Sequence, residues 1–320
     1  MMVSESERTM RAFLFPGQGS QAVGMGQALS AASPVARETF QEVDDALKQA
    51  LSKLMANGPE ADLTLTENAQ PAIMANALAT LRVLEREGGV RLADKADYVA
   101  GHSLGEYSAL CAAEALDLPT TARLLKLRGR AMQAAVPVGM GAMAALLGLD
   151  FDAAKAVVAE AAQGEVCEAA NDNGGGQVVV SGHVAAVERA MEIAKSKGAK
   201  RALLLPVSAP FHCALMAPAA AAMEAALADV VLRAPLLPVY TNVTAGPVAD
   251  PDTIRRLLVE QVTGTVRWRE SVAAMFAAGV TEFVEFGGKV LTPMVKRIAP
   301  EAKAVSVTTM SDIEAFAATL

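Results

Sequence analysis

The sequence is poor in the residues that mark several classes of protein. Only 4% of its 320 residues are aromatic, and it has three cysteines and three histidines. The cysteines are odd in number and show no CxxC spacing, which argues against a disulfide scaffold and a bound metal. No Lys/Arg block stands out in a chain with a formal charge of −7, so we expect no nucleic-acid partner. A reducing, cytoplasmic location fits this composition best.

Long hydrophobic runs are also missing. Residues 1–8 are polar, so we expect no signal peptide. The stretch from Ala202 to Met223 lacks charged side chains, but Pro206, Pro210 and Pro218 interrupt it. This pattern favours a strand, a loop and a helix over a transmembrane helix, and we expect no membrane partner.

Small and aliphatic residues dominate what is present. The chain is 52% hydrophobic and rich in Ala, Val, Leu and Met, which favours a helix-rich α/β protein. Apolar runs such as 11–15 and 98–100 predict short strands, and helical spacing predicts helices over 70–87 and 121–135. Because strands and helices alternate, we expect a mostly parallel sheet.

The pattern changes near residue 138, where a glycine-containing turn begins a strand-helix-strand-helix-strand run. Such a run predicts a small α+β unit inserted into the larger α/β body. We therefore predict two subdomains, a large one made of residues 1–137 and 208–320 and a small one made of residues 138–207.

One motif carries chemistry. Gly101-His102-Ser103-Leu104-Gly105 matches the G-x-S-x-G nucleophile elbow, with a short apolar strand before it and a helix after it. The elbow projects the serine Oγ from the edge of a sheet and points the N-terminus of the next helix at the reacting carbonyl. Ser103 is thus the predicted nucleophile.

A serine nucleophile needs a base. His102 adjoins Ser103, so its side chain diverges from the serine, and His183 begins a helix, where capping is the simpler explanation. His212 lies in a loop after a strand and is the predicted base, although a buried structural histidine is the alternative. No Asp or Glu is near it in sequence, so a distant acid or a backbone carbonyl would have to orient its ring.

An arginine lies on the wrong face of a helix. In the helix predicted over 121–135, Arg128 falls at about 40° on a wheel whose apolar residues span about −60° to +100°. An uncompensated buried charge costs several kcal/mol. Arg128 therefore needs a partner, either an internal carboxylate or an anionic ligand such as an acyl group that ends in a carboxylate.

The first strand ends in a glycine turn. Gly17, Gly19 and Ala22 satisfy G-x-G-x-x-A, so a dinucleotide site is one interpretation. Pro16 in the turn, and the absence of an acid at the end of a second strand, weaken it. A turn that aims backbone N–H groups at a reacting oxygen explains the same glycines.

Together these residues resemble the malonyl-CoA:acyl carrier protein transacylase family. The resemblance runs from about residue 11 to 298 and consists of several motifs in the same order. They are Phe15-Pro16-Gly17-Gln18-Gly19-Ser20-Gln21, Gln70-Pro71-Ala72, Gly101 to Leu110, Arg128-Gly129 with Met132-Gln133, Gly176-Gln177-Val178-Val179, Pro210 to Met216, and Asn242-Val243. The C-terminal turn Glu285-Phe286-Gly287-Gly288-Lys289 departs from the family by being one residue shorter.

The resemblance implies a hydrolase-like α/β body carrying a ferredoxin-like insert. It implies that malonyl-CoA acylates Ser103, that His212 is the base, and that acyl carrier protein accepts the malonyl group on its phosphopantetheine thiol, with no bound cofactor. The further roles it implies are an oxyanion hole from the backbone N–H groups of Gln18 and Leu104, malonyl binding by Arg128, orientation of the histidine by the Gln261 carbonyl, and looser pocket positions at Gln70 and Asn171.

Two other functions use the same features. A serine hydrolase or thioesterase would use the elbow with water as acceptor, but Arg128 and the absence of a well-placed acid for His212 argue against it. A non-catalytic nucleotide-binding module would use the first glycine turn instead. Malonyl transfer to acyl carrier protein is the function that the sequence favours; the resemblance implies that it supplies fatty acid synthesis, and the residues themselves leave polyketide synthesis open.

Overall fold

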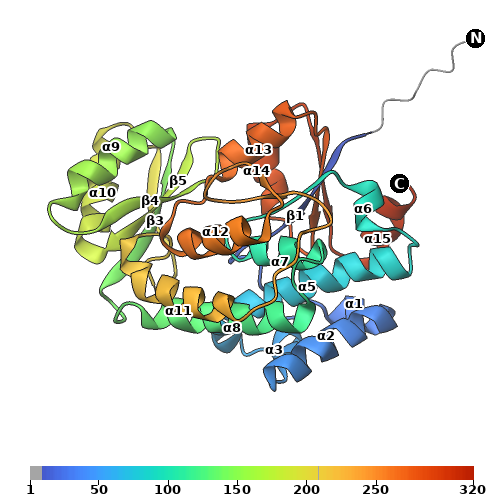
Figure 1. The fold of residues 1–320 in the computed structure, drawn as a ribbon. Helices are drawn as coiled ribbons and strands as arrows, with labels where there is room; N and C mark the ends of the chain where they lie inside the picture. The colour runs from blue at the N-terminus through green and yellow to red at the C-terminus, as the bar shows by residue number, and fades with distance from the viewer. Residues whose placement is uncertain (1–8, 208) are drawn as a thin grey trace, which may run out of the picture.

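The computed structural model describes residues 9–207 and 209–320. Residues 1–8 and Ser208, which the sequence analysis assigned to the large subdomain, lie outside the described residues. Within the described part of the chain, two sheets form, and each has its own set of covering helices (Figure 1). The α/β fold class expected from the sequence is confirmed.

The larger sheet is mostly parallel. Its order is β10-β9-β1-β2-β7-β8, and only the pairing of β7 with β8 is antiparallel. Its strands are β1 (Arg11–Phe15), β2 (Tyr98–Gly101), β7 (Val239–Tyr240), β8 (Pro247–Val248), β9 (Glu282–Phe286) and β10 (Lys303–Val307).

The helices around this sheet come from both parts of the chain that flank the small unit. Before it lie α1 (Gln27–Ala32), α2 (Pro34–Leu47), α3 (Leu51–Asn57), α4 (Glu60–Thr64), α5 (Thr66–Arg86), α6 (Leu92–Lys95), α7 (Gly105–Ala112) and α8 (Leu118–Ala134). After it lie the 3-10 turn η1 (Ala214–Met216), α11 (Ala217–Ala228), α12 (Pro251–Thr263), α13 (Trp268–Ala277), α14 (Leu291–Ile298) and α15 (Met310–Ala317).

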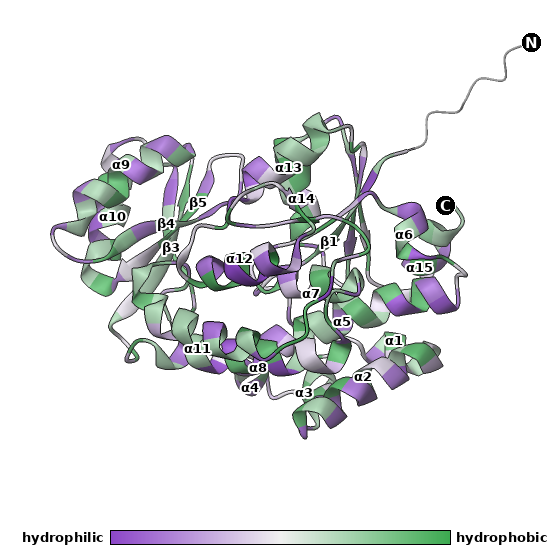
Figure 2. Cartoon of the chain, viewed as in Figure 1, coloured by the Kyte–Doolittle hydropathy of each residue, from purple (hydrophilic) through white to green (hydrophobic). Residues whose placement is uncertain are grey.

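Both faces of the larger sheet are buried. Phe13 and Phe15 of β1 belong to the core shared with α2, α5 and α8, whereas Ala12 and Leu14 face the core shared with α13 and α14. Successive side chains of a strand point to opposite faces, so a strand covered on both sides is apolar throughout. Helices at the surface are two-sided instead, and α2 shows both green and purple faces in Figure 2.

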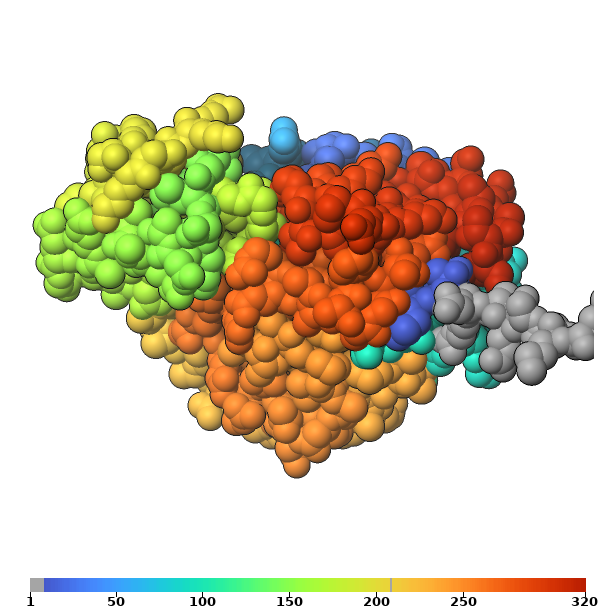
Figure 3. Space-filling model, turned by 90° about the horizontal axis from the view of Figure 1, so that it is seen from above, coloured from blue at the N-terminus to red at the C-terminus, as the bar shows by residue number. Residues whose placement is uncertain are grey.

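The small sheet is antiparallel, in the order β4-β5-β3-β6. Its elements follow the chain order β3 (Gly141–Leu147), α9 (Phe151–Ala162), β4 (Cys167–Asp172), β5 (Gln177–His183), α10 (Val184–Ser196) and β6 (Arg201–Leu204). This β-α-β-β-α-β order and strand arrangement are those of a ferredoxin-like unit. It has its own hydrophobic core and forms one end of the molecule (Figures 1 and 3). The predicted limits of 138 and 207 enclose all of these elements, and the division into two subdomains stays a prediction.

The two sheets are joined where β4 meets the segment before α13. Val266 bridges Asn171 in parallel fashion, donating its N–H to the Ala170 carbonyl at 2.8 Å and accepting one from Asp172 at 3.0 Å. Arg269 then pairs with the buried carboxylate of Asp172 at 2.8 Å. The outer edge of β4 is thus fixed to the large body.

The sequence placed several elements imperfectly. The helix expected over 70–87 begins at Thr66 and contains Pro71 in its interior, because burial against α2 and α8 outweighs the poor helix propensity of proline. β8, β10 and α15 were not expected. In the shorter C-terminal turn, the buried Glu285 carboxylate accepts the backbone N–H groups of Val290, Leu291 and Thr292, and so caps the start of α14.

No helix among the described residues is long and apolar enough to cross a membrane. The passage from Ala202 to Met223 forms the end of β6, a loop, η1 and the first part of α11. Its prolines lie between or at the start of these elements.

Candidate active site

The carboxyl ends of the central parallel strands bring three loops together. β1 and β2 are in register, with Phe15 opposite Gly101, and β2 and β7 pair Ala100 with Tyr240. The turns that follow these strands therefore lie at one edge of the sheet, where such folds bind their ligands. They carry Gln18, Ser103 and Asn242.

The turn at Ser103 is a strained elbow. Ser103 has a φ of 54°, a left-handed conformation that non-glycine residues rarely adopt. A Cβ atom at Gly101 would lie 1.8 Å from the carbonyl oxygen of Gly105, and one at Gly105 would lie 2.2 Å from that of Phe15. Only glycine fits at either position, which explains the two glycines of the motif.

Ser103 and His212 are hydrogen-bonded. The serine Oγ lies 2.8 Å from Nε2 of the imidazole, and Nδ1 lies 2.9 Å from the carbonyl oxygen of Gln261. Because a carbonyl oxygen only accepts, Nδ1 carries the ring proton and Nε2 is left to accept the serine hydroxyl. The sequence left open whether a distant acid or a backbone carbonyl orients the His212 ring. Among the described residues, the group in contact with Nδ1 is the backbone carbonyl of Gln261.

Burial keeps the His212 imidazole neutral. The side chain is 3% exposed, and this desolvation, together with the nearby charge of Arg128, lowers the pKa of His212 to about 3. A neutral imidazole is the form that can remove a proton.

Arg128 projects from α8 toward the serine. It is 1% exposed, and its guanidinium donates to Gln70 Oε1 at 2.8 Å, to Gln261 Oε1 at 2.9 Å and to Ser103 Oγ at 3.2 Å. Its hydrogen-bond partners are neutral, and no ion pair with a carboxylate is formed among the described residues. The helical wheel predicted that Arg128 pairs with either an internal carboxylate or an anionic ligand. Among the described residues, no carboxylate lies at ion-pair distance from it.

The other expected site residues lie at different distances from this centre. Gln70, on α5, contacts Arg128, and Leu104 is the N-cap of α7 directly after the serine. Gln18 follows Gly17, whose missing Cβ leaves room for the carbonyl oxygen of His102, 2.7 Å from where that atom would be. The first glycine turn is thus packed against the elbow. Asn171 lies on β4 beside Val266, and its position in the smaller sheet separates it from the Ser103–His212 pair in sequence and in sheet.

Several polar groups beneath the elbow were not expected from the sequence. Asn242 accepts the Ser103 N–H at 2.7 Å and donates to the Gly101 carbonyl at 2.7 Å. The Glu106 carboxylate accepts from Asn242 N and from the side chain of Gln261, each at 2.9 Å. Burial raises the pKa of Glu106 to about 7. In the sequence, Glu106 and Asn242 stand out only as parts of a family pattern, because their hydrogen-bond partners are distant along the chain.

The histidines that were set aside have structural partners. His102 Nε2 lies 2.9 Å from Asn173 Oδ1, and its ring packs against Trp268 with centroids 5.6 Å apart. His183 is the N-cap of α10 and accepts the Val166 N–H at 3.0 Å. His102 therefore connects the elbow to the segment that follows β4, and of the three histidines His212 is the one that reaches the serine hydroxyl.

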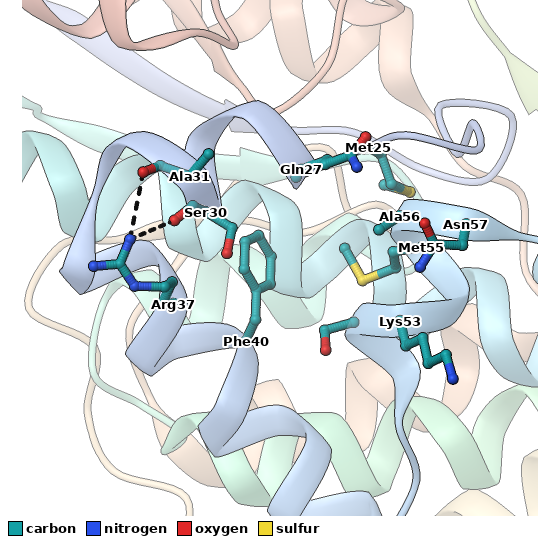
Figure 4. Close-up of a pocket in the computed structure, with 12 residues that line it drawn as sticks. Met25, Gln27, Ser30, Ala31, Arg37, Phe40, Lys53, Met55, Ala56 and Asn57 are labelled. Carbon is teal, nitrogen blue, oxygen red and sulfur yellow. Dashed lines mark hydrogen bonds between the residues drawn. The ribbon is translucent and has the colours of Figure 1, made fainter.

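A separate hollow of about 430 Å³ lies among α1, α2 and α3 (Figure 4). Phe40, Met25 and Met55 form apolar walls, while Arg37 is held at its rim by the backbone carbonyls of Ser30 and Ala31. No residue of the Ser103 site lines it.

A serine on a strand-turn-helix elbow, hydrogen-bonded to a neutral histidine, is the arrangement used by serine acyltransferases and hydrolases. Comparison with known proteins separates these classes. The model of the acyl transferase domain family matches residues 12–310. The malonyl CoA-acyl carrier protein transacylase of Escherichia coli (strain K12) is 47% identical, covering 91% of this chain and 93% of its own.

Solved structures agree with this result. The acyl-carrier-protein-S-malonyltransferase from Bartonella henselae superimposes with a TM-score of 0.95 at 53% identity, covering 97% of this chain and 99% of its own. A complex described as a type II PKS acyl-carrier protein with its malonyl-transacylase gives a TM-score of 0.94 at 41% identity, covering 98% of this chain and 100% of its own. The chain is an acyltransferase and belongs to the malonyl CoA-acyl carrier protein transacylase family, which confirms the resemblance.

Proposed function

We propose that this protein transfers the malonyl group of malonyl-CoA to the phosphopantetheine thiol of acyl carrier protein, through a malonyl ester on Ser103, and so supplies fatty acid synthesis. The observation that carries the substrate choice is Arg128, a buried cation that donates to the nucleophile's own oxygen at 3.2 Å. A carboxylate two carbons from the reacting carbonyl suits a guanidinium beside that carbonyl. The names of the relatives support the same pair of substrates.

The first half-reaction forms the acyl-enzyme. His212 Nε2 removes the proton from Ser103 Oγ as the oxygen attacks the thioester carbonyl, and an Oγ–C bond forms. The C–S bond then breaks, and the imidazolium returns its proton to the departing sulfur, which releases CoA-SH. The 2.8 Å contact between Oγ and Nε2 supports this proton transfer.

The second half-reaction repeats these steps with a different sulfur. The phosphopantetheine thiol gives its proton to His212 and attacks the malonyl ester, and Ser103 Oγ leaves and recovers the proton. One site thus releases the CoA thiol in the first half-reaction and accepts the phosphopantetheine thiol as nucleophile in the second, which makes the kinetics ping-pong. In both half-reactions, as proposed, the bonds and protons balance without an oxidant, a metal or a cofactor.

The remaining roles are proposed from position. Gln18 and Leu104 flank the elbow, and we assign their backbone N–H groups to the oxyanion of the tetrahedral intermediate, where loss of one donor typically costs about 3–4 kcal/mol. The Gln261 carbonyl orients His212, and Gln70 steadies Arg128. Asn171 is proposed as a more distant pocket residue, on the small subdomain. The three free buried thiols support a cytoplasmic location.

An intact-mass experiment tests this function. The protein is mixed with malonyl-CoA, and we expect one malonyl adduct, which disappears in Ser103→Ala. Ser108→Ala is the matched control, because it removes a buried hydroxyl from α7, the helix that follows the elbow, and this hydroxyl has no hydrogen-bond partner among the described residues. Adding acyl carrier protein should move the malonyl group to the carrier. Release of free malonate in place of malonylated carrier would show a hydrolase, and wild-type protein without any adduct would favour a binding module.

A further inference from the structure

A fully buried carboxylate lies directly beneath the elbow. Glu106 belongs to the first turn of α7 and is 0% exposed. Its Oε2 atom accepts two hydrogen bonds of 2.9 Å, from the backbone N–H of Asn242 and from Nε2 of Gln261. Its Oε1 atom has no partner among the described residues. One oxygen therefore joins the loop after β7 to the helix α12.

Each of these partners also contacts the reacting pair. Asn242 Oδ1 accepts the backbone N–H of Ser103 at 2.7 Å, and the Gln261 carbonyl accepts from His212 Nδ1 at 2.9 Å. Gln261 Nε2 reaches the Ser103 carbonyl as well, at 3.0 Å. The segments that orient the serine and the histidine thus meet at a single atom of Glu106.

Glu106 also helps to orient the Gln261 amide, together with the Ser103 carbonyl that accepts from the same NH₂ group. A glutamine side chain has one end that donates and one that accepts. Because the NH₂ end points to the Glu106 carboxylate, the oxygen faces the Arg128 guanidinium, at 2.9 Å from Nη2. If the amide were reversed, its NH₂ group would face the guanidinium, which has no atom that can accept a hydrogen bond.

We propose that Glu106 is a positioning residue for acyl transfer, and that the reach of its Oε2 atom to Asn242 and Gln261 holds Ser103, His212 and Arg128 in their reactive arrangement. This inference rests on the proposed function, because the reaction it serves is acylation of Ser103. Reach, and not charge, is the property that matters. The carboxylate does not form an ion pair with Arg128 within the described residues, and both of its hydrogen bonds need only an oxygen at the right place.

Two substitutions separate reach from charge. Glu106→Gln keeps the length of the side chain and an oxygen that can accept both hydrogen bonds, but it removes the charge. Glu106→Asp keeps the charge but is one methylene shorter, so its oxygen cannot meet both donors. The rate of Ser103 malonylation is measured in a single turnover at saturating malonyl-CoA, by quenched flow and intact mass. The control is Ser108→Ala, on the same helix.

We expect Glu106→Gln to acylate within about threefold of the wild type and Glu106→Asp to acylate about 10- to 100-fold more slowly, as expected when a buried hydrogen-bond donor is left without its acceptor. An Asp variant as fast as the Gln variant, or faster, would overturn the inference. If Glu106→Asp does not fold, the Gln variant decides, and a loss greater than about tenfold overturns it. Wild-type protein without an adduct would instead reject the proposed function and leave Glu106 outside the result.

Discussion

Replacing Arg128 by alanine should separate malonyl transfer from acetyl transfer. In the proposed complex the guanidinium binds the malonyl carboxylate in a site that is 1% exposed. Removing one partner of such a buried charge pair costs about 3–5 kcal/mol, or roughly 100- to several-thousand-fold in kcat/KM. Acetyl has no carboxylate, so it should lose only the hydrogen bond from the charged Arg128 guanidinium to Ser103 Oγ, about 1.5–3 kcal/mol or roughly 10- to 150-fold, a bond that malonyl loses in addition to its ion pair.

The assay follows CoA release from malonyl-CoA and acetyl-CoA with the same preparations of protein and acyl carrier protein. Arg123→Ala is the matched control, because Arg123 lies on the same helix but is exposed, and within the described part of the chain its hydrogen bond goes to Thr120. It should leave both rates near those of the wild type. Equal losses for the two substrates in Arg128→Ala would mean that the arginine supports the fold and does not read the acyl group.

Three further results are expected. Because burial and the Arg128 charge lower the pKa of His212 to about 3, the neutral base is present above that pH and is lost only as the pH falls through it. The pH profile of kcat/KM for the wild type should therefore be flat from pH 7 to 5, and a loss of activity with a midpoint near pH 6.5 would contradict this. In Arg128→Ala, the pH at which activity is lost on the acid side should be higher, because the arginine charge no longer lowers the pKa of His212. Burial raises the pKa of Glu106 from its usual 4.5 to about 7, so its contribution to stability is present below pH 4.5 and is lost as the pH rises through 7. Between pH 4.5 and 8 the wild type should lose about 3 kcal/mol of unfolding free energy that Glu106→Gln retains. Urea unfolding of both proteins across this pH range measures the loss, and a difference in stability between them that does not change with pH would disprove it. Finally, Gly101→Ala should yield no folded, acylating protein, because its Cβ would lie 1.8 Å from a backbone carbonyl oxygen. Gly246→Ala is the control, because its Cβ would meet nothing closer than 3.8 Å. A normal melting temperature for Gly101→Ala would be inconsistent with the elbow.

The parts of the site that the sequence predicted are those with a local signature. The elbow is five consecutive residues between a strand and a helix, and the structure has this order. Arg128 was expected to be buried because helical spacing alone places it among apolar side chains, and it is 1% exposed. The mostly parallel sheet followed from alternating strands and helices in the same way.

The parts that the sequence did not predict depend on partners far along the chain. In the sequence, Glu106 is an acidic residue in the first turn of a helix, where an exposed carboxylate commonly stabilises the helix by interacting with its dipole. Only the packing of α7 on all sides buries it, and its partners Asn242 and Gln261 are more than a hundred residues away. β10 was missed because it is a short edge strand that is only partly buried, so its apolar pattern is weak.

The point at which the small unit enters the chain has a consequence for folding. The chain leaves the large body after the helix that carries Arg128 and returns just before the turn that carries His212. The first and last strands of the unit, β3 and β6, pair side by side, with Ala144 opposite Leu204. Once this unit has formed its own core, its ends are already close together.

Folding of the small unit thus shortens the effective loop between the arginine and the histidine roughly fourfold. Closure entropy grows with the logarithm of loop length, so this lowers the cost of bringing the two groups to Ser103 by about 1 kcal/mol. The excursion separates the two groups widely in sequence while adding little to the entropy of assembling the site.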